Sequence, residues 1–172
     1  MRQAGRIVGA TLTLLRQSVR PGITTRELDA IAERNIRKLG GIPAFKGYRG
    51  FPGSICASIN QQIVHGIPGE AVLQEGDLIK MDVGAVYDGF IGDAAITVGA
   101  GTITDEANKL IEVTRQSLEV GINAATDGAR TGDIGAAVQS YAEGQGDYGV
   151  VREYVGHGVG RFLHEDPQIP NY

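Results

Sequence analysis

The chain has little cysteine and no long apolar run, and each shortage excludes a class of protein. Among 172 residues there is one cysteine, so no disulfide can form within the chain, which suits a reducing cytoplasm. No run of about 18 apolar residues occurs, so we expect no membrane span. The first twenty residues do not read as a signal peptide, because Arg6 and Arg16 interrupt their apolar stretch.

The balance of charge limits the choice of partners. The net charge is −4, and the 16 Lys and Arg residues are scattered without forming a basic stripe. We therefore expect no general grip on nucleic acid. The length suits one domain with one sizeable core, and residues 1–172 are assigned to a single domain.

Helix and turn signals outline a first half of two helices followed by strands. Apolar residues recur at helical spacing over residues 2–19. A second helix is expected to begin at Thr24, where Glu27 completes a capping box, and to end at Gly40. Beyond a loop rich in Gly and Pro, strands are expected over residues 54–60, 62–66 and about 78–98.

A second half repeats the helices in the same order. One helix is expected to begin at Thr104 and a shorter one near Thr131. The inward face of the first is predicted to include Ala107, Leu110, Ile111, Leu118 and Ile122. At an offset of 106 residues Thr25 aligns with Thr131, which indicates an internal duplication. The same offset places a second hairpin at about 184–204, past the last residue of this sequence.

Asp82 and Asp93 are the most informative pair of residues, because they flank a turn signal, Asp88-Gly89. Strands joined by this two-residue turn place Asp82 opposite Ala95. Side chains alternate along a strand, so the two aspartates share one face. Two carboxylates held close within a sheet repel each other, and a divalent metal between them would relieve the repulsion. The structural alternative is a solvated face beside a turn.

The chain has three histidines, His65, His157 and His164, and each lies next to glycine or a turn. Any one of them alone is readily explained as a surface histidine. Together with the aspartate pair they indicate a site, and the glycines around His157 would let a ligand approach closely. Two aspartates and one imidazole suit Mn, Fe, Co or Zn better than Ca. No zinc-finger spacing, phosphate loop or Ser–His–Asp elbow is present.

Six short motifs surround these residues in the sequence. In chain order they are Cys56-Ala57-Ser58-Ile59-Asn60, Val64-His65-Gly66-Ile67-Pro68, Asp82-Val83-Gly84, Gly92-Asp93-Ala94-Ala95, Gly156-His157-Gly158-Val159-Gly160 and His164-Glu165-Asp166-Pro167. Together they resemble the type I methionine aminopeptidases, from near Met1 to Tyr172. The resemblance implies an α/β (α+β) pita-bread fold, a pseudo-twofold sandwich of antiparallel sheet with flanking helices, here with an incomplete second half.

The resemblance also implies an activity and a metal site. Members of the family are metal-dependent aminopeptidases that remove the initiator methionine from nascent proteins, by attack of a metal-bound hydroxide on the scissile peptide. By their positions in the motifs, Asp82, Asp93 and His157 look like metal ligands. Asp93 resembles the carboxylate that bridges two ions. The ions implied are divalent, and Co, Mn, Fe or Zn are all compatible.

Five further residues match positions that bind substrate in the family. His65 and His164 resemble the catalytic histidines that contact the substrate around the scissile peptide. Tyr48, Phe51 and Cys56 fall where the family builds its pocket for the methionine side chain. Packing in the core would explain these three residues equally well.

The sequence departs from the family at its C-terminal end. The family has five protein ligands, and the last two are glutamates that follow the His164 region. Neither Glu153 nor Glu165 fills those positions. The complete site holds two ions, whereas we expect this chain to hold one ion weakly. We accordingly expect a C-terminally truncated piece with impaired activity and marginal stability.

The resemblance implies partners and leaves two alternatives open. The expected partners are peptides with an N-terminal methionine, nascent chains and, with them, the ribosome. We expect the protein to be a cytoplasmic monomer that does not contact membranes. One alternative is a non-catalytic pita-bread binding protein, which the absent glutamates suggest and the three intact histidines disfavour. The other is a proline-directed peptidase of the same fold, which usually carries an extra N-terminal domain.

Overall fold

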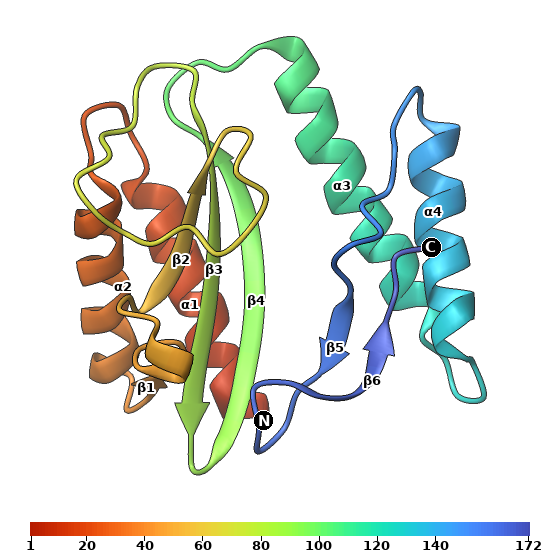
Figure 1. The fold of residues 1–172 in the computed structure, drawn as a ribbon, viewed down its shortest axis with the longest axis horizontal. Helices are drawn as coiled ribbons and strands as arrows, with labels where there is room; N and C mark the ends of the chain where they lie inside the picture. Colours follow the sequence, from red (N-terminus) through yellow and green to blue (C-terminus); the bar gives the residue numbers. More distant parts are fainter. The chain divides into compact units, whose positions relative to one another are not determined.

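The computed structural model describes all of residues 1–172, which divide into two compact units (Figure 1). Unit 1 comprises Met1–Thr104 and Gly160–Leu163, and unit 2 comprises Asp105–Val159 and His164–Tyr172. The assignment of the whole chain to a single domain stays a prediction. No helix in the structure has the length and apolar character of a membrane span.

A four-stranded antiparallel sheet forms the centre of unit 1. The long strand β3 (Leu78–Tyr87) pairs along one edge with β4 (Phe90–Gly99). Along its other edge β3 pairs with β1 (Ile42–Pro43) and β2 (Ile55–Ile59). A short 3₁₀ helix, η1 (Tyr48–Gly50), lies in the connection between β1 and β2.

The β3–β4 hairpin has the register that the sequence predicted. Asp82 pairs with Ala95 and Gly84 with Asp93, so the two aspartates lie on the same face of the sheet. The turn holds Asp88 at φ 50° and Gly89 at φ 73°, the left-handed conformations that a tight turn of this kind requires. An Asp-Gly pair adopts them at little cost, which explains why the turn fixes the register.

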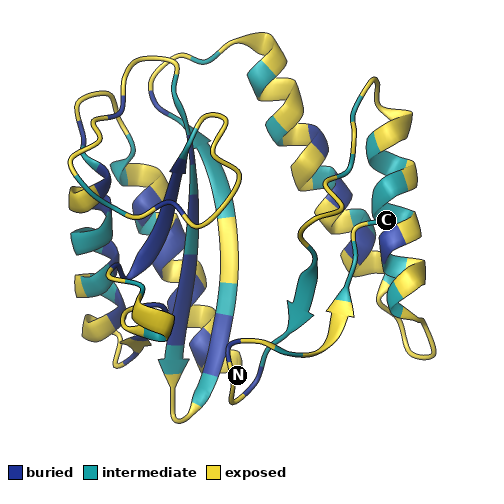
Figure 2. Ribbon diagram, viewed as in Figure 1, coloured by how far each residue is buried: buried dark blue, intermediate teal, exposed yellow.

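Two helices of unit 1, α1 (Arg2–Ser18) and α2 (Thr25–Lys38), pack against the sheet (Figure 1). Thr24 caps α2 in the predicted capping box: its amide donates to Glu27 Oε2 at 2.8 Å, and the Glu27 amide donates to Thr24 Oγ1 at 3.1 Å. The helices and the sheet share one apolar core, drawn dark blue in Figure 2. Its members include Ile7, Val8, Leu12, Leu15, Leu28, Ala32, Ile36, Ile79, Met81 and Val83.

Close packing of α1 on the hairpin depends on a glycine in β4. A Cβ atom on Gly92 would lie 2.8 Å from the backbone carbon of Ala4 in α1. Backbone atoms cannot move aside as the end of a side chain can, so only glycine allows this approach. The odd-numbered residues of β3 fill the same core, and Asp82 therefore faces the other side of the sheet.

Unit 2 contains α3 (Asp105–Ala124), α4 (Thr131–Gly144) and a small antiparallel pair, β5 (Gly156–Gly158) with β6 (Glu165–Ile169). Shifting the bounds of α2 by 106 residues gives 131–144, the bounds of α4. The same shift carries α1 to 108–124, which lies within α3. The predicted repeat of two helices is confirmed in position and order.

The prediction of a strand over residues 62–66 was wrong, because this segment is irregular. His65 has φ 59°, a left-handed conformation that no regular strand contains. The next residue, Gly66, is buried against β2: the Ala57 amide donates to Gly66 O at 2.8 Å, and the Gly66 amide donates to Ser58 Oγ at 3.0 Å. Alternation of residue types alone did not reveal this local contact.

The predicted inward face of α3 was also wrong in part. Leu110, Leu118 and Ile122 are 46%, 60% and 62% exposed, whereas Val113, Ser117 and Gly121 are the buried residues of this helix. The reason is the packing partner, since α3 packs on α4 and a Cβ on Gly121 would lie 2.8 Å from Val138 Cγ2. Periodicity identified an apolar stripe on α3, but a different stripe meets α4.

We expect Ile79→Ala to destabilise the protein by about 2–5 kcal/mol, because Ile79 is fully buried in the core of unit 1 and its truncation leaves a cavity. Urea unfolding followed by circular dichroism measures the change. Ile67→Ala is the matched control: Ile67 is 62% exposed, and this variant should change the free energy of unfolding by less than about 0.5 kcal/mol. Equal losses in both variants would contradict the assigned core.

Candidate functional site

Two carboxylates meet on the face of the unit 1 sheet that α1 and α2 leave uncovered. Asp82 lies near the middle of β3, where it pairs with Ala95 of β4. Asp93 is also on β4, two residues before Ala95, and is therefore the diagonal neighbour of Asp82. Their carboxyl groups are close enough for one to hydrogen-bond the other. Both residues are half-buried, so water screens the two charges only in part.

Burial raises the pKa of Asp82 well above its ordinary value, and the negative charge of Asp93 raises it further. The hydrogen bond with Asp93 acts in the same direction. Cys56 lies opposite Asp82 in β2. Burial, followed by the charges of Asp82 and Asp93, raises the pKa of Cys56 to about 12, so its thiol stays protonated at neutral pH. This part of the sheet favours a proton or a cation.

Two of the three histidines lie together in unit 2. His157 is in β5 and His164 immediately precedes β6, and their ring centroids are 4.3 Å apart with the rings tilted by 42°. His157 Nδ1 is 2.9 Å from Gly158 O. A carbonyl oxygen can only accept, so Nδ1 carries a proton, and in the neutral form of this imidazole the lone pair is on Nε2. This orientation through a backbone carbonyl is common for histidines that bind metals.

The third histidine belongs to the irregular segment of unit 1 that lies against β2. His65 is exposed and keeps its left-handed backbone because its neighbour Gly66 is fixed by hydrogen bonds to Ala57 and Ser58. A side chain on Gly66 would collide with the carbonyl of Ala57. The backbone that presents His65 is therefore anchored beside the strand that contains Cys56.

The predicted pocket residues lie in and beside the β1–β2 connection. Tyr48 begins η1 and Phe51 follows it, and both side chains are half-buried. Neither belongs to the core shared by α1, α2 and the sheet, which favours a pocket wall over core packing for these two. Cys56 is buried and lies in β2.

Two acids on α2 that the sequence reading did not single out hold this connection in place. Asp29 Oδ1 accepts from the amides of Ser54 at 2.6 Å and Ile55 at 3.0 Å. Glu33 Oε2 accepts from Lys46 Nζ at 2.7 Å and from Ser54 Oγ at 3.2 Å. The hydrogen bond from Lys46 is the main cause that lowers the pKa of Glu33. The only sequence signal was their spacing of four residues on one side of α2.

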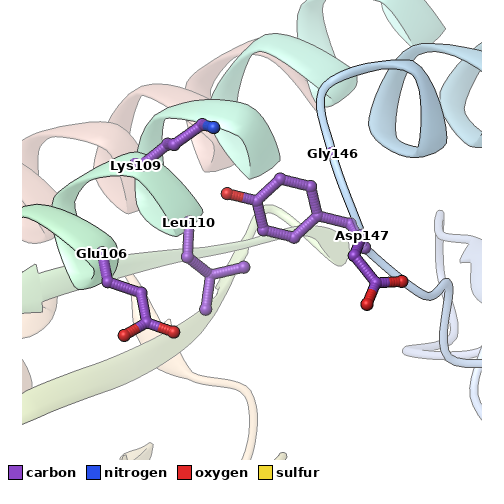
Figure 3. A pocket seen from close by; sticks show the side chains of 6 residues that line it. Glu106, Lys109, Leu110, Gly146 and Asp147 are labelled. Carbon is purple, nitrogen blue, oxygen red and sulfur yellow. The ribbon is translucent and has the colours of Figure 1, made fainter.

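A pocket of about 390 Å³ lies in unit 2, and it involves none of the predicted site residues. Figure 3 shows Glu106, Lys109 and Leu110 of α3 facing the segment that contains Gly146 and Asp147. Its lining combines one cation and two carboxylates with one aliphatic side chain and the aromatic ring of Tyr148. None of the histidines or of the other predicted site residues is among the lining residues, so this pocket does not add to the candidate site.

The structure thus places the predicted site residues in two groups. Unit 1 contains Asp82, Asp93, His65 and the pocket residues, and unit 2 contains His157 and His164. No three His, Cys, Asp or Glu side chains come together as a group that could hold a metal ion. The assignment of Asp82, Asp93 and His157 to one ion stays a prediction, since the carboxylates belong to one unit and the imidazole to the other.

Comparison with known proteins places this chain in a family. Residues 1–172 match the model of metallopeptidase family M24. The chain is 55% identical over 172 residues to methionine aminopeptidase 1 of Bacillus subtilis, and the match covers all of this chain and 69% of that protein.

Solved structures agree with this assignment. The crystal structure of methionine aminopeptidase from Thermotoga maritima matches with a TM-score of 0.97 and 44% identity, over 100% of this chain and 69% of that one. Prolidase from Pyrococcus furiosus shares the fold, with a TM-score of 0.84 at 23% identity, over 99% of this chain and 49% of that one. The fold class predicted from the six motifs is confirmed, and the chain belongs to metallopeptidase family M24 and, within it, to the methionine aminopeptidases.

Proposed function

We propose that the protein is a metal-dependent aminopeptidase that removes the N-terminal methionine of nascent proteins. The observation that carries this proposal is the identity of 55% to a methionine aminopeptidase along the whole chain, with Asp82, Asp93 and the three histidines all present. A proline-directed peptidase is less well supported, because the likeness to prolidase at 23% identity concerns the fold alone. Nothing in the structure favours a purely binding role over catalysis.

The donor groups fit a divalent metal ion. Asp82 and Asp93 place two half-buried carboxylates side by side, and burial together with their mutual repulsion raises the pKa of Asp82. A cation would remove this electrostatic cost. His157 adds a nitrogen whose lone pair is fixed on Nε2 by the bond to Gly158. Oxygen and imidazole ligands of this kind suit Co, Mn, Fe or Zn.

The chain itself supports the assignment of His157 to the same ion. Only two residues separate His157 from Gly160, whose carbonyl accepts from the Ile91 amide at 2.8 Å. Ile91 precedes Asp93 by two residues in β4. The segment Gly160–Leu163 belongs to unit 1 and is held there by this bond and by Arg161, whose guanidinium lies 4.4 Å from the centre of the Phe90 ring.

In the proposed reaction each residue has a defined task. Asp82, Asp93 and His157 hold the divalent ion, which supplies Lewis acidity toward a carbonyl or a water oxygen. His65 and His164 donate hydrogen bonds to the substrate around the scissile peptide, and bonds that strengthen as charge develops accelerate the reaction. Contact with the tilted ring of His157 restricts the orientation of the His164 ring.

The methionine side chain of the substrate is proposed to lie among Tyr48, Phe51 and Cys56. Aromatic rings and a protonated thiol form a soft apolar wall that suits a thioether. Asp29 and Glu33 hold the segment that carries this wall in place beside β2, because they accept hydrogen bonds from Ser54 and Ile55. Polypeptides that begin with methionine emerge from the ribosome. The proposed function therefore implies a cytoplasmic protein that acts on nascent chains.

We expect Asp93→Ala to abolish metal uptake and hydrolysis of a Met-Ala-Ser peptide, because it removes one of the two adjacent carboxylates. Calorimetric titration with Mn or Co measures uptake, and release of free methionine measures hydrolysis. Asp88→Asn is the matched control: Asp88 is an exposed turn residue on the same hairpin, and Asn tolerates its left-handed backbone. Unchanged metal stoichiometry in Asp93→Ala would contradict the site.

We expect the turnover of this chain to be well below that of its Bacillus subtilis relative, because three proposed ligands hold one ion weakly. Steady-state hydrolysis of the same peptide, measured for both proteins at saturating Mn, gives the comparison. The chain should bind about one ion, with waters completing the coordination shell. Turnover equal to that of the relative, or two tightly bound ions, would contradict the proposed ligand set.

We expect Asp82→Asn to stabilise the metal-free protein by on the order of 1–3 kcal/mol at neutral pH. The substitution removes a carboxylate whose ionised form burial and the charge of Asp93 disfavour. The side-chain amide of the new asparagine can also donate a hydrogen bond to Asp93. Urea unfolding in the presence of a chelator measures the gain. The Asp88→Asn control should leave the midpoint nearly unchanged, and a loss of stability in Asp82→Asn would show that the pair is not under repulsion.

A further inference from the structure

Helix α1 carries arginines and no acidic residue at all. Arg2, Arg6 and Arg16 are exposed, and none of the three takes part in an ion pair. Arg2 and Arg6 are four residues apart, and Arg16 follows Arg2 by fourteen residues, close to four helical turns. The three cations therefore lie along one side of α1, over about 21 Å of its axis.

This row of arginines faces away from the core. The buried residues of α1 lie on the opposite side, and they are Ala4, Ile7, Val8, Thr11, Leu12 and Leu15. Gly9 and Thr13 lie between the arginines on the exposed side, and both are small. An extended anion could approach the helix closely there, because no bulky side chain stands between the cations.

Helix α2 adds two exposed cationic side chains, and its own acidic side chains are already engaged by other groups. Arg34 and Lys38 are exposed and make no ion pair. The acids of α2 are all engaged: Glu27 in the cap, Asp29 by the amides of Ser54 and Ile55, and Glu33 by Lys46 and Arg37. The positive charge of these two helices is thus not neutralised within unit 1.

The modest net charge of the chain conceals an uneven distribution. Unit 1 contains 12 Lys and Arg residues against 9 Asp and Glu, a net charge of +3. Unit 2 contains 4 against 11, a net charge of −7, and the two add to the −4 of the chain. The cations are scattered along the sequence, whereas the helical period brings Arg2, Arg6 and Arg16 to one side of α1.

We propose that the row formed by Arg2, Arg6 and Arg16 is a binding surface for the phosphate backbone of RNA. One guanidinium group can donate two parallel hydrogen bonds to the oxygens of one phosphate. Several such contacts along a helix suit a polymer that carries charge at regular intervals. The choice of RNA rests on the proposed function, because nascent chains emerge beside ribosomal RNA. A membrane surface fits less well, since α1 exposes no large apolar side chain that could enter a bilayer.

The test is binding of a short labelled RNA duplex to the whole chain, measured by fluorescence anisotropy at low salt. We expect Arg2→Gln, Arg6→Gln and Arg16→Gln together to weaken binding by about tenfold or more, and to flatten its dependence on salt. The matched control combines Asn108→Glu, Lys109→Gln and Ser140→Glu in unit 2, which lowers the net charge by the same amount. This control should bind as the unmodified chain does. Replacing the three arginines by lysine should weaken binding less than the glutamine variant does, because the charge remains while the paired guanidinium hydrogen bonds are lost.

Each other outcome overturns the proposal. No RNA binding at low salt would show that the surface does not bind RNA, and equal weakening by both triple variants would leave only a general charge effect. Binding to phosphatidylglycerol vesicles in preference to RNA would assign the surface to membranes instead. Hydrolysis of the Met-Ala-Ser peptide, measured in the same preparations, separates this inference from the proposed function: loss of RNA binding with unchanged hydrolysis concerns the surface alone.

Discussion

The repulsion between two carboxylates on adjacent strands is the constraint on which the rest of this structure depends. The backbone pairing of β3 with β4, which the hairpin turn fixes, brings Asp82 and Asp93 together despite the repulsion between their charges. The apolar core beneath α1 and α2 supplies the stability that tolerates this arrangement. A sheet anchored on one face can present on the other a pair of charges that would separate in a looser framework.

The sequence revealed those parts of the fold that local chemistry decides. The Asp88-Gly89 turn fixed the register of the hairpin, and the Thr24 cap and the apolar period fixed α1 and α2. Contacts between distant residues decided the rest. The backbone at His65 follows from the burial of Gly66 on β2, and the inward face of α3 follows from its contact with α4, neither of which a residue pattern shows.

The candidate site was predictable to a different extent. Asp82 and Asp93 could be placed on one face from alternation alone. No pattern in the sequence showed that the rings of His157 and His164 lie in contact, because Gly156–Gly158 has little intrinsic preference for a strand. Asp29 and Glu33 escaped notice because their partners lie 13 to 26 residues away along the chain. Residues that support a site through backbone bonds leave a weaker trace in sequence than residues that act in it.

The environment of Cys56 has a consequence for how this protein withstands oxidants. Peroxides attack the thiolate form of cysteine, and burial of Cys56 disfavours that form by raising the pKa of the thiol. The one cysteine of the chain is therefore protected from sulfenic acid formation and from mixed disulfides with small thiols. The sulfur of Cys56 can therefore contribute a polarizable apolar surface to the sheet without making this position sensitive to oxidation.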